Sequence, residues 1–458
     1  MENEKMGDSR GQEASPQRQG GMEARRVPRR IAQTVLNSLK GGVVPRIGLP
    51  YIAVGRKSEI EALLRDVEII SEGGASCRFI VGRYGSGKSF LLQTIRNYAF
   101  DRGFIVADAD LSPERYLHGS HGKGLATYRE LIQNLSTKTK PEGGALALVL
   151  DRWISQVQSE VKEETLLPLG DPKLSEATDR RIYETVSSVG EMVHGFEFGK
   201  LLSDYYHSYL NGDEETRNRV IKWFRGEYAT RKEAKADLGI NLIISDDDWY
   251  EYLKLFAVFF RKAGYSGMMV MIDELVNLHR IVNPVMRQNN YEKLLTIYND
   301  ALQGKARYLG IIMGATPEAL EDKRKGIYSY EALRSRLAES RFSAPGARDL
   351  LSPVIRLEPL SAEEMLVLSE KLLHMHAGLY GYEPGLTTED LSDFIKLEFG
   401  RVGADRLITP REVIRDFVGL LDMLYQNPGM GIKDVLESDG FSFSEANEAA
   451  DGFEGFTV

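Results

Sequence analysis

A glycine-rich segment at residues 82–89 constrains this chain more than any other feature of its sequence. It reads GRYGSGKS, with an apolar run at 77–81 before it and a helical pattern of apolar residues at 90–99 after it. A glycine-rich turn between a buried strand and a helix lets backbone N–H groups surround phosphate oxygens. The pattern predicts a phosphate-binding loop in a parallel α/β sheet; the alternative is a turn that happens to contain Lys-Ser.

The loop also predicts how a bound nucleoside triphosphate is held. Lys88 is expected to bridge the β- and γ-phosphates, and the Ser89 hydroxyl is expected to ligate Mg²⁺. The expected nucleotide contacts in this segment are Gly82, Tyr84, Gly85, Ser86, Gly87, Lys88, Ser89 and Phe90.

A second motif, MMVMIDE at 268–274, is an apolar run that ends in two acidic residues. Opposite Ser89, Asp273 would hold hydrated Mg²⁺ and Glu274 would orient or deprotonate a water molecule. Alone the motif is weak evidence, because a buried strand often ends in acidic residues where it meets solvent. Together with the loop it favours hydrolysis over a small-molecule kinase, since a glutamate at this place suits water as the nucleophile.

Four further candidate residues follow along the chain. Thr316 ends an apolar run at the ligand-binding edge of the expected sheet, and is either a γ-phosphate contact or a helix N-cap. Arg336 and Arg341 are candidates for an arginine that reaches a neighbouring subunit's γ-phosphate, with a solvated helix arginine as the alternative for each. Arg411 lies at the start of the last helix, where a helical lid would close over the nucleotide.

Length and composition indicate a globular protein of several units. The chain has 458 residues, of which 42 % are apolar and 27 % charged, so a sizeable core and about three domains are expected. The predicted segments are a disordered tail at 1–25, a linker and first part of the α/β core at 26–111, a helical insertion at 112–260, the second part of the core at 261–358, a helical lid at 359–428 and an acidic tail at 429–458.

Charge and cysteine content exclude several classes of protein. The net charge of −9 excludes an overall basic coat for nucleic acid, although it leaves room for a local basic patch. The single cysteine, Cys77, excludes a disulfide framework and a multi-cysteine zinc site. His118 and His121 are interpreted as loop residues rather than metal ligands. No membrane-spanning run or signal peptide is recognised, so a cytoplasmic protein without membrane contact is expected.

Two basic clusters are candidates for DNA contact. One lies at residues 25–30, and the other lies at 217–235, where Trp223 and Phe224 are interleaved with cations. Stacking combined with phosphate contact would suit nucleic acid. The alternative is a solvated helix face whose cations are offset by neighbouring glutamates.

The order of these motifs resembles that of the AAA+ ATPases, and within them the Orc/Cdc6-like and STAND-like branches. In those branches a Val-Gly-Arg-x-x-Glu-like element closes on the adenine, and residues 54–59 here read VGRKSE. The resemblance implies Gly55 and Arg56 as nucleotide contacts, and Lys88, Ser89, Asp273 and Glu274 as the hydrolytic set. It also implies Thr316 as sensor 1, Arg336 or Arg341 as the arginine finger and Arg411 as sensor 2.

A narrower resemblance is to the BREX-system ATP-binding family, of the BrxD-like type, from bacterial phage-defence loci. The similar segments are RRIA at 29–32, GGVVP at 41–45, GRYGSGKS at 82–89, ADADLS at 107–112 and GYSGMMVMIDE at 264–274. The resemblance covers about residues 29–425. It implies an antiviral ATPase that uses ATP and Mg²⁺, forms homo-oligomers, and works on double-stranded DNA with other defence proteins, including a helicase-like partner.

Two departures from the AAA+ pattern bear on these expectations. Orc/Cdc6 relatives carry a winged helix after the lid, and the 34 residues that follow Leu424 are too few for one. The long spacing between Arg336 and the next expected strand leaves open which arginine is the arginine finger. The alternatives are a STAND-like nucleotide switch with slow hydrolysis and an Orc/Cdc6-like DNA loader.

Overall fold

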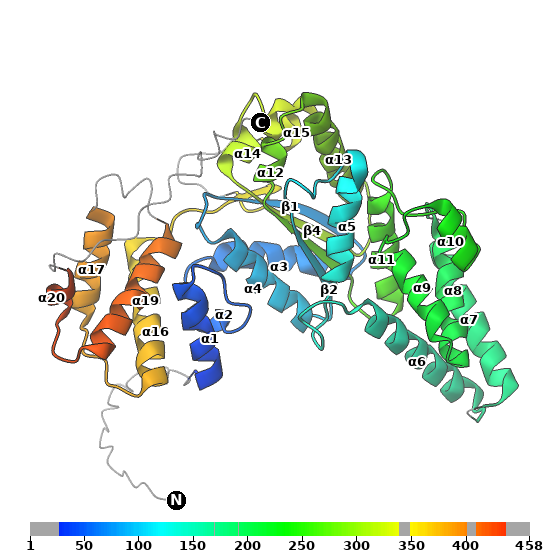
Figure 1. The fold of residues 1–458 in the computed structure, drawn as a ribbon, viewed down its shortest axis with the longest axis horizontal. Coiled ribbons are helices and arrows are strands. Elements are labelled where there is room, and N and C mark those ends of the chain that lie inside the picture. Colours follow the sequence, from blue (N-terminus) through cyan, green and yellow to red (C-terminus); the bar gives the residue numbers. More distant parts are fainter. Residues whose placement is uncertain (1–26, 169, 191, 339–348, 401–408, 437–458) are drawn as a thin grey trace, which may run out of the picture.

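A computed structural model describes residues 27–168, 170–190, 192–338, 349–400 and 409–436 (Figure 1). The predicted tail at 1–25, most of the predicted acidic tail and Arg341 lie outside these residues. In the described part, five parallel strands form one sheet in the order β2-β3-β4-β1-β5. The strands are β1 (Ala75–Val81), β2 (Ile105–Asp110), β3 (Met268–Asp273), β4 (Leu309–Ala315) and β5 (Val354–Arg356). The predicted parallel α/β sheet is therefore confirmed.

Helices cover both faces of the sheet. Its central strands are apolar on both faces, so both faces are buried. All seven residues of β4 are buried, as are the first five of β3. Continuous apolar runs of this kind are typical of parallel strands with helices on both sides. Alternate residues of β1 divide between the two faces: Phe79 and Val81 belong to one hydrophobic cluster, and Ile80 belongs to another.

Two sets of helices cover these faces. The face that carries Ile80 packs against α3 (Lys57–Ser71) and α4 (Lys88–Asp101). The other face packs against α5 (Lys123–Gln133), α11 (Trp249–Lys262) and α13 (Pro284–Leu302). The carboxyl ends of the strands lead to the short helices α12 (Val276–His279), α14 (Pro317–Glu321) and α15 (Glu331–Leu337), with 3-10 turns at Ser120–Gly122 and Ile327–Ser329.

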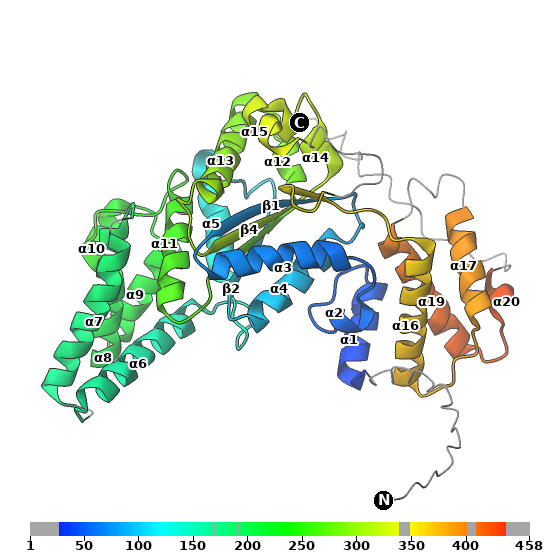
Figure 2. The same ribbon diagram turned by 180° about the vertical axis from the view of Figure 1, so that it is seen from behind.

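The long helical segment between β2 and β3 forms an arm at one end of the molecule (Figure 2). The helices of the arm are α6 (Leu146–Thr165), α7 (Pro172–Gly190), α8 (Gly195–Asn211), α9 (Glu214–Phe224) and α10 (Arg231–Leu238). One continuous hydrophobic cluster runs from β1 and β3 into this arm and includes Trp153, Trp223 and Trp249. The arm therefore shares its core with the sheet.

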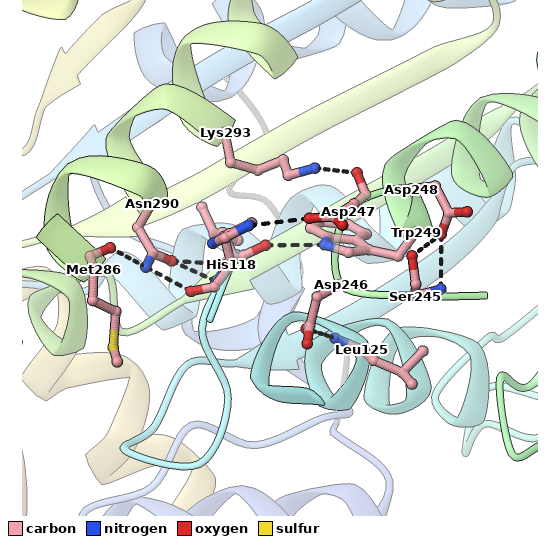
Figure 3. A network of polar contacts seen from close by, with 11 residues as sticks. His118, Leu125, Ser245, Asp246, Asp247, Asp248, Trp249, Met286, Asn290 and Lys293 are labelled. Carbon is pink, nitrogen blue, oxygen red and sulfur yellow. Dashed lines mark hydrogen bonds and ion pairs between the residues drawn. The ribbon is translucent and has the colours of Figure 1, made fainter. Parts of the chain in front are cut away.

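A polar network fastens the loop between β2 and α5 to α13 and to the segment before α11 (Figure 3). Buried Asn290 accepts hydrogen bonds from the backbone N–H groups of Leu117 (2.8 Å) and His118 (2.9 Å), and it donates one to the His118 carbonyl (2.7 Å). The Trp249 indole donates to the Leu117 carbonyl at 2.9 Å, and His118 Nε2 lies 3.2 Å from Asp247 Oδ1. His118 is thus held as part of a loop, and the described residues contain no group of three or more possible metal ligands around it.

A second helical unit lies at the other end of the molecule. It contains α16 (Ala362–Tyr380), α17 (Thr388–Gly400), α19 (Pro410–Gln426) and α20 (Ile432–Leu436). The N-terminal helices α1 (Arg29–Lys40) and α2 (Leu49–Ile52) share its hydrophobic cluster. The start of the predicted linker thus forms α1, which packs with this second helical unit, and Ile432 and Val435, placed in the acidic tail, are buried in α20.

In the described part of the chain, no helix combines the length and the apolar character that crossing a bilayer requires.

Candidate functional site

The glycine-rich segment forms a tight loop between β1 and α4. Gly85 and Gly87 have φ angles of +75° and +94°, which side chains rarely adopt, and α4 begins at Lys88. A Cβ atom on Gly82 would lie 2.4 Å from Ser86 Oγ, so this position also requires glycine. The curled backbone and the positive end of α4 together make an anion-binding concavity.

Lys88 lies across this loop. Its Nζ donates hydrogen bonds to the carbonyl oxygens of Gly82 (2.8 Å) and Arg83 (3.0 Å). Burial lowers the pKa of Lys88, while the carboxylates of Asp273 and Glu274 act in the opposite direction. The ammonium therefore lies between the loop and the two acidic residues at the end of β3.

Ser89 in the first turn of α4, which follows β1, meets Asp273 at the end of β3, although β4 lies between β1 and β3 in the sheet. Ser89 Oγ donates a hydrogen bond of 2.9 Å to Asp273 Oδ2. Room for this carboxylate depends on Gly314 of β4, where a Cβ atom would lie 2.0 Å from Asp273 Oδ1. A hydroxyl and a carboxylate are oxygen ligands of the kind that Mg²⁺ takes in phosphate-binding proteins, so the donor set fits the ion.

Glu274 follows Asp273 in a left-handed backbone conformation. Its φ angle is +62°, and its N–H donates a hydrogen bond of 2.9 Å to Asp273 Oδ1. Such a conformation costs of the order of 1 kcal/mol for a residue with a side chain, and it turns the carboxylate toward the cleft. Burial raises the pKa of Glu274, and the neighbouring Asp273 carboxylate raises it further.

A third carboxylate, missed in the sequence, lies beside this pair. Asp110 ends β2 directly opposite Asp273 in the β2–β3 register. Burial raises the pKa of Asp110, as does the charge of Asp273. The signal was present in the ADADLS segment, since parallel strands place their carboxyl ends at one edge.

A cleft runs from the phosphate loop to the second helical unit and encloses about 1060 Å³ when its open mouth is included. Predicted residues that line it are Arg56, Tyr84, Gly85, Ser86, Gly87, Lys88, Ser89, Phe90, Glu274 and Arg411. Apolar residues that were not predicted line its far end: Leu39, Val43, Val44, Ile52, Val54, Leu360, Leu368 and Ile414. The signal for part of this set was the GGVVP segment at 41–45.

Arg56 lines the cleft and connects its walls. Its guanidinium is buried and donates hydrogen bonds to the carbonyl oxygens of Ser86 (3.1 Å) and Glu358 (2.7 Å). A Cβ atom on the preceding Gly55 would lie 2.7 Å from Glu364 Oε1. These contacts join the segment before α3 to the phosphate loop and to the start of the second helical unit.

Arg411 approaches the phosphate loop from α19 of the second helical unit. Its guanidinium carbon lies 4.8 Å from the centroid of the Tyr84 ring, within the range of a cation–π contact. Thr409 and Glu412 form a capping box that begins α19, and Thr409 packs so closely on the loop that a Cβ atom on Gly85 would lie 2.5 Å from its Oγ1.

Two of the other predicted residues lie outside this cleft. Thr316 stands at the carboxyl end of β4, where its side chain accepts a hydrogen bond from Ala319 N–H (3.3 Å) and caps α14. Arg336 on α15 donates to Asn299 Oδ1 at 3.1 Å and to the Ala332 carbonyl at 2.7 Å. Thr316 thus makes the capping contact that was the alternative interpretation.

The basic cluster of the arm is not a stacking surface. Trp223 and Phe224 are 1 % and 0 % exposed, so the predicted stacking of bases on these rings is wrong. Both side chains face the shared core because they lie on the apolar side of α9. Among the neighbouring cations, Arg219 pairs with Glu215 at 2.6 Å and Lys222 with Glu233 at 2.5 Å.

The parallel sheet, the glycine loop at a helix N-terminus and the serine–aspartate pair beside it are compatible with a phosphate-loop NTPase. The family model described as "BREX system ATP-binding protein BrxC/D" matches residues 27–440. The chain therefore belongs to this family, and the family's description supports ATP binding. No curated protein gives a significant match to the sequence.

Proposed function

We propose that this protein is a Mg²⁺-dependent AAA+ ATPase that couples ATP hydrolysis to assembly or remodelling of a DNA-associated antiphage defence complex. The observation that carries the proposal is the contact of 2.9 Å between Ser89 Oγ and Asp273 Oδ2, with Glu274 next to it at the cleft. Together these residues form a metal-binding edge with a base beside it.

In this proposal each residue has a defined task. The loop backbone and Lys88 bind the phosphates. Ser89 and Asp273 would hold Mg²⁺, and the ion would supply positive charge next to the phosphates. Glu274 orients the attacking water and accepts its proton; its raised pKa makes it a stronger base than an ordinary glutamate. Arg411, close to the loop, is proposed to contact the phosphates from the lid.

Catalysis is proposed to require neighbouring subunits. Arg336 lies on an exposed part of α15, outside the cleft of its own chain. An arginine supplied by a neighbouring copy would stabilise the charge that grows in the transition state. The proposed partners are therefore further copies of this chain, other defence proteins and duplex DNA.

A STAND-like nucleotide switch is a second candidate, favoured by the way the cleft is built. Its far end is lined by the N-terminal segment and by the lid, so nucleotide binding would bias how these parts pack. A phosphate-release assay with and without duplex DNA separates the two functions. The remodelling ATPase predicts faster turnover with DNA, whereas slow turnover that DNA does not change would support the switch and contradict the remodelling proposal.

A further inference from the structure

A basic patch lies on elements that follow β3 and β4. It consists of Arg280 after α12, Arg287 on α13, and Lys323, Arg324 and Lys325 in the turn after α14. Both views place α12, α13 and α14 together at one end of the sheet (Figures 1 and 2). Four of the five cations are exposed, and Arg287 is half-buried.

Hydrogen bonds and an ion pair fix the turn that carries three of these cations. The Asp322 carboxylate accepts hydrogen bonds from the backbone N–H groups of Arg324 (2.7 Å) and Lys325 (3.3 Å), and it pairs with His279 at 2.9 Å. The Tyr291 hydroxyl donates to the Lys325 carbonyl at 2.5 Å. Contacts from α12 and α13 therefore fix the backbone of the turn.

The exposed cations of the patch are available to an external partner. In the part of the chain that the structure describes, the side chains of Arg280, Lys323, Arg324 and Lys325 form no ion pair or hydrogen bond. The one acidic residue in the turn, Asp322, is already engaged with His279 and the backbone, and these bonds lower its pKa to about 2. On a chain with a net charge of −9, such a cluster favours a polyanion.

We propose that this patch binds the phosphate backbone of duplex DNA, which would make it the DNA-contacting surface of the function proposed above. Proteins that bind single strands combine cations with exposed aromatic rings, whereas here Tyr291 is 1 % exposed and the Tyr328 hydroxyl is bonded to the Leu337 carbonyl at 2.9 Å. Cations without stacking rings suit backbone contacts, which carry no sequence information.

The test is binding of a fluorescein-labelled duplex, measured by anisotropy over a range of salt concentrations in the absence of ATP. The variant carries Lys323→Gln, Arg324→Gln and Lys325→Gln. It should bind at least about 10-fold more weakly, and the slope of log K against log salt should fall by about 2.7 for three lost phosphate contacts. Each single Gln variant should reduce the slope by about a third of this decrease.

A matched control removes three exposed cations from α10 with Arg231→Gln, Lys232→Gln and Lys235→Gln. It should bind the duplex like the unchanged protein, and both triple variants should keep the unchanged melting temperature and basal turnover. The proposal would be overturned if the unchanged protein did not bind the duplex or if the patch variant bound it equally well. It would also be overturned if the control variant, rather than the patch variant, lost duplex binding. Equal binding of a single strand, or equal competition by polyglutamate, would overturn it too. Because binding is measured without hydrolysis, failure here is distinct from failure of the ATPase proposal.

Discussion

At the scale of single residues, the Asp273 carboxylate connects the parts of the site. One oxygen accepts from the Ser89 hydroxyl at 2.9 Å, and the other accepts from the Glu274 N–H at 2.9 Å. Gly314 leaves the space that the second oxygen occupies. The position of this carboxylate, the proposed metal ligand, thus depends on a glycine in a neighbouring strand.

Gly314→Ala should therefore disturb the site without removing any functional group. A Cβ atom 2.0 Å from Asp273 Oδ1 must displace the carboxylate, so we expect Mg²⁺-dependent ATP affinity to fall at least about 10-fold in calorimetry. Gly378→Ala is the matched control, because Gly378 lies in α16 with open space around its Cβ position. Equal affinities for both variants and the unchanged protein would argue against the role of Asp273.

The raised pKa of Glu274 predicts a particular pH profile. A base must be deprotonated to act, so kcat should be retained above the pKa of Glu274 and fall as the pH drops through it. Because burial and Asp273 raise this pKa, the acid limb should lie above the ordinary glutamate value of 4.5. The measurement is kcat against pH, with circular dichroism to confirm that the protein stays folded; an acid limb below that value would contradict the assignment.

The sequence predicted the pair Ser89 and Asp273 because both motifs end buried strands of one parallel sheet. It assigned Arg56 to the nucleotide, yet this guanidinium bonds to the carbonyls of Ser86 and Glu358. A motif states that an arginine is needed at a position. It does not distinguish a ligand contact from a brace, since both use the same donors.

At the scale of elements, α1 shows what the sequence leaves unspecified about packing. Its residues were assigned to a linker before the core, and it packs against α16 and α19. Helical periodicity indicates which face of a helix is buried but not which element covers it. The same limitation applies to α20, whose five residues are too few to show a pattern within an acidic tail.

The contact between Arg411 of α19 and the phosphate loop leads to a prediction for Tyr84. If its ring holds Arg411 over the cleft, Tyr84→Ala should weaken ATP binding by about 2- to 5-fold, the equivalent of an exposed cation–π contact. Tyr84→Phe keeps the ring and should bind ATP like the unchanged protein. Calorimetric titration gives both values, and a Phe variant as weak as the Ala variant would rule out the ring contact as the cause.

At the scale of the whole molecule, the arm and the sheet are one folding unit. Phe198 on α8 is fully buried and contacts Phe224, Phe256 and Phe259, inside the cluster that also contains Phe79 of β1. Composition and motifs identified the arm as an insertion. They did not indicate that it shares a core with the sheet, because such packing joins residues far apart in the chain.

Phe198→Ala should therefore destabilise both parts together. Loss of a buried phenyl ring costs about 3–5 kcal/mol, so the melting temperature should fall. Fluorescence of a Trp249→Phe background reports the arm through Trp153 on α6 and Trp223 on α9, and nucleotide binding reports the sheet. The two unfolding midpoints should coincide and fall together. Phe196→Ala, a control two residues away at a position that is 77 % exposed, should change neither midpoint. Separate midpoints would contradict a shared core.

The central claim is that this cleft hydrolyses ATP with Glu274 as the base, and one comparison tests it directly. Phosphate release is measured for the unchanged protein and for Glu274→Gln, with ATP affinity determined for both. Glu227→Gln, at an exposed position on the arm, serves as the control. The account predicts that Glu274→Gln binds ATP normally and releases phosphate at least about 100-fold more slowly, within the range for loss of a general base. Full turnover by Glu274→Gln would contradict the account.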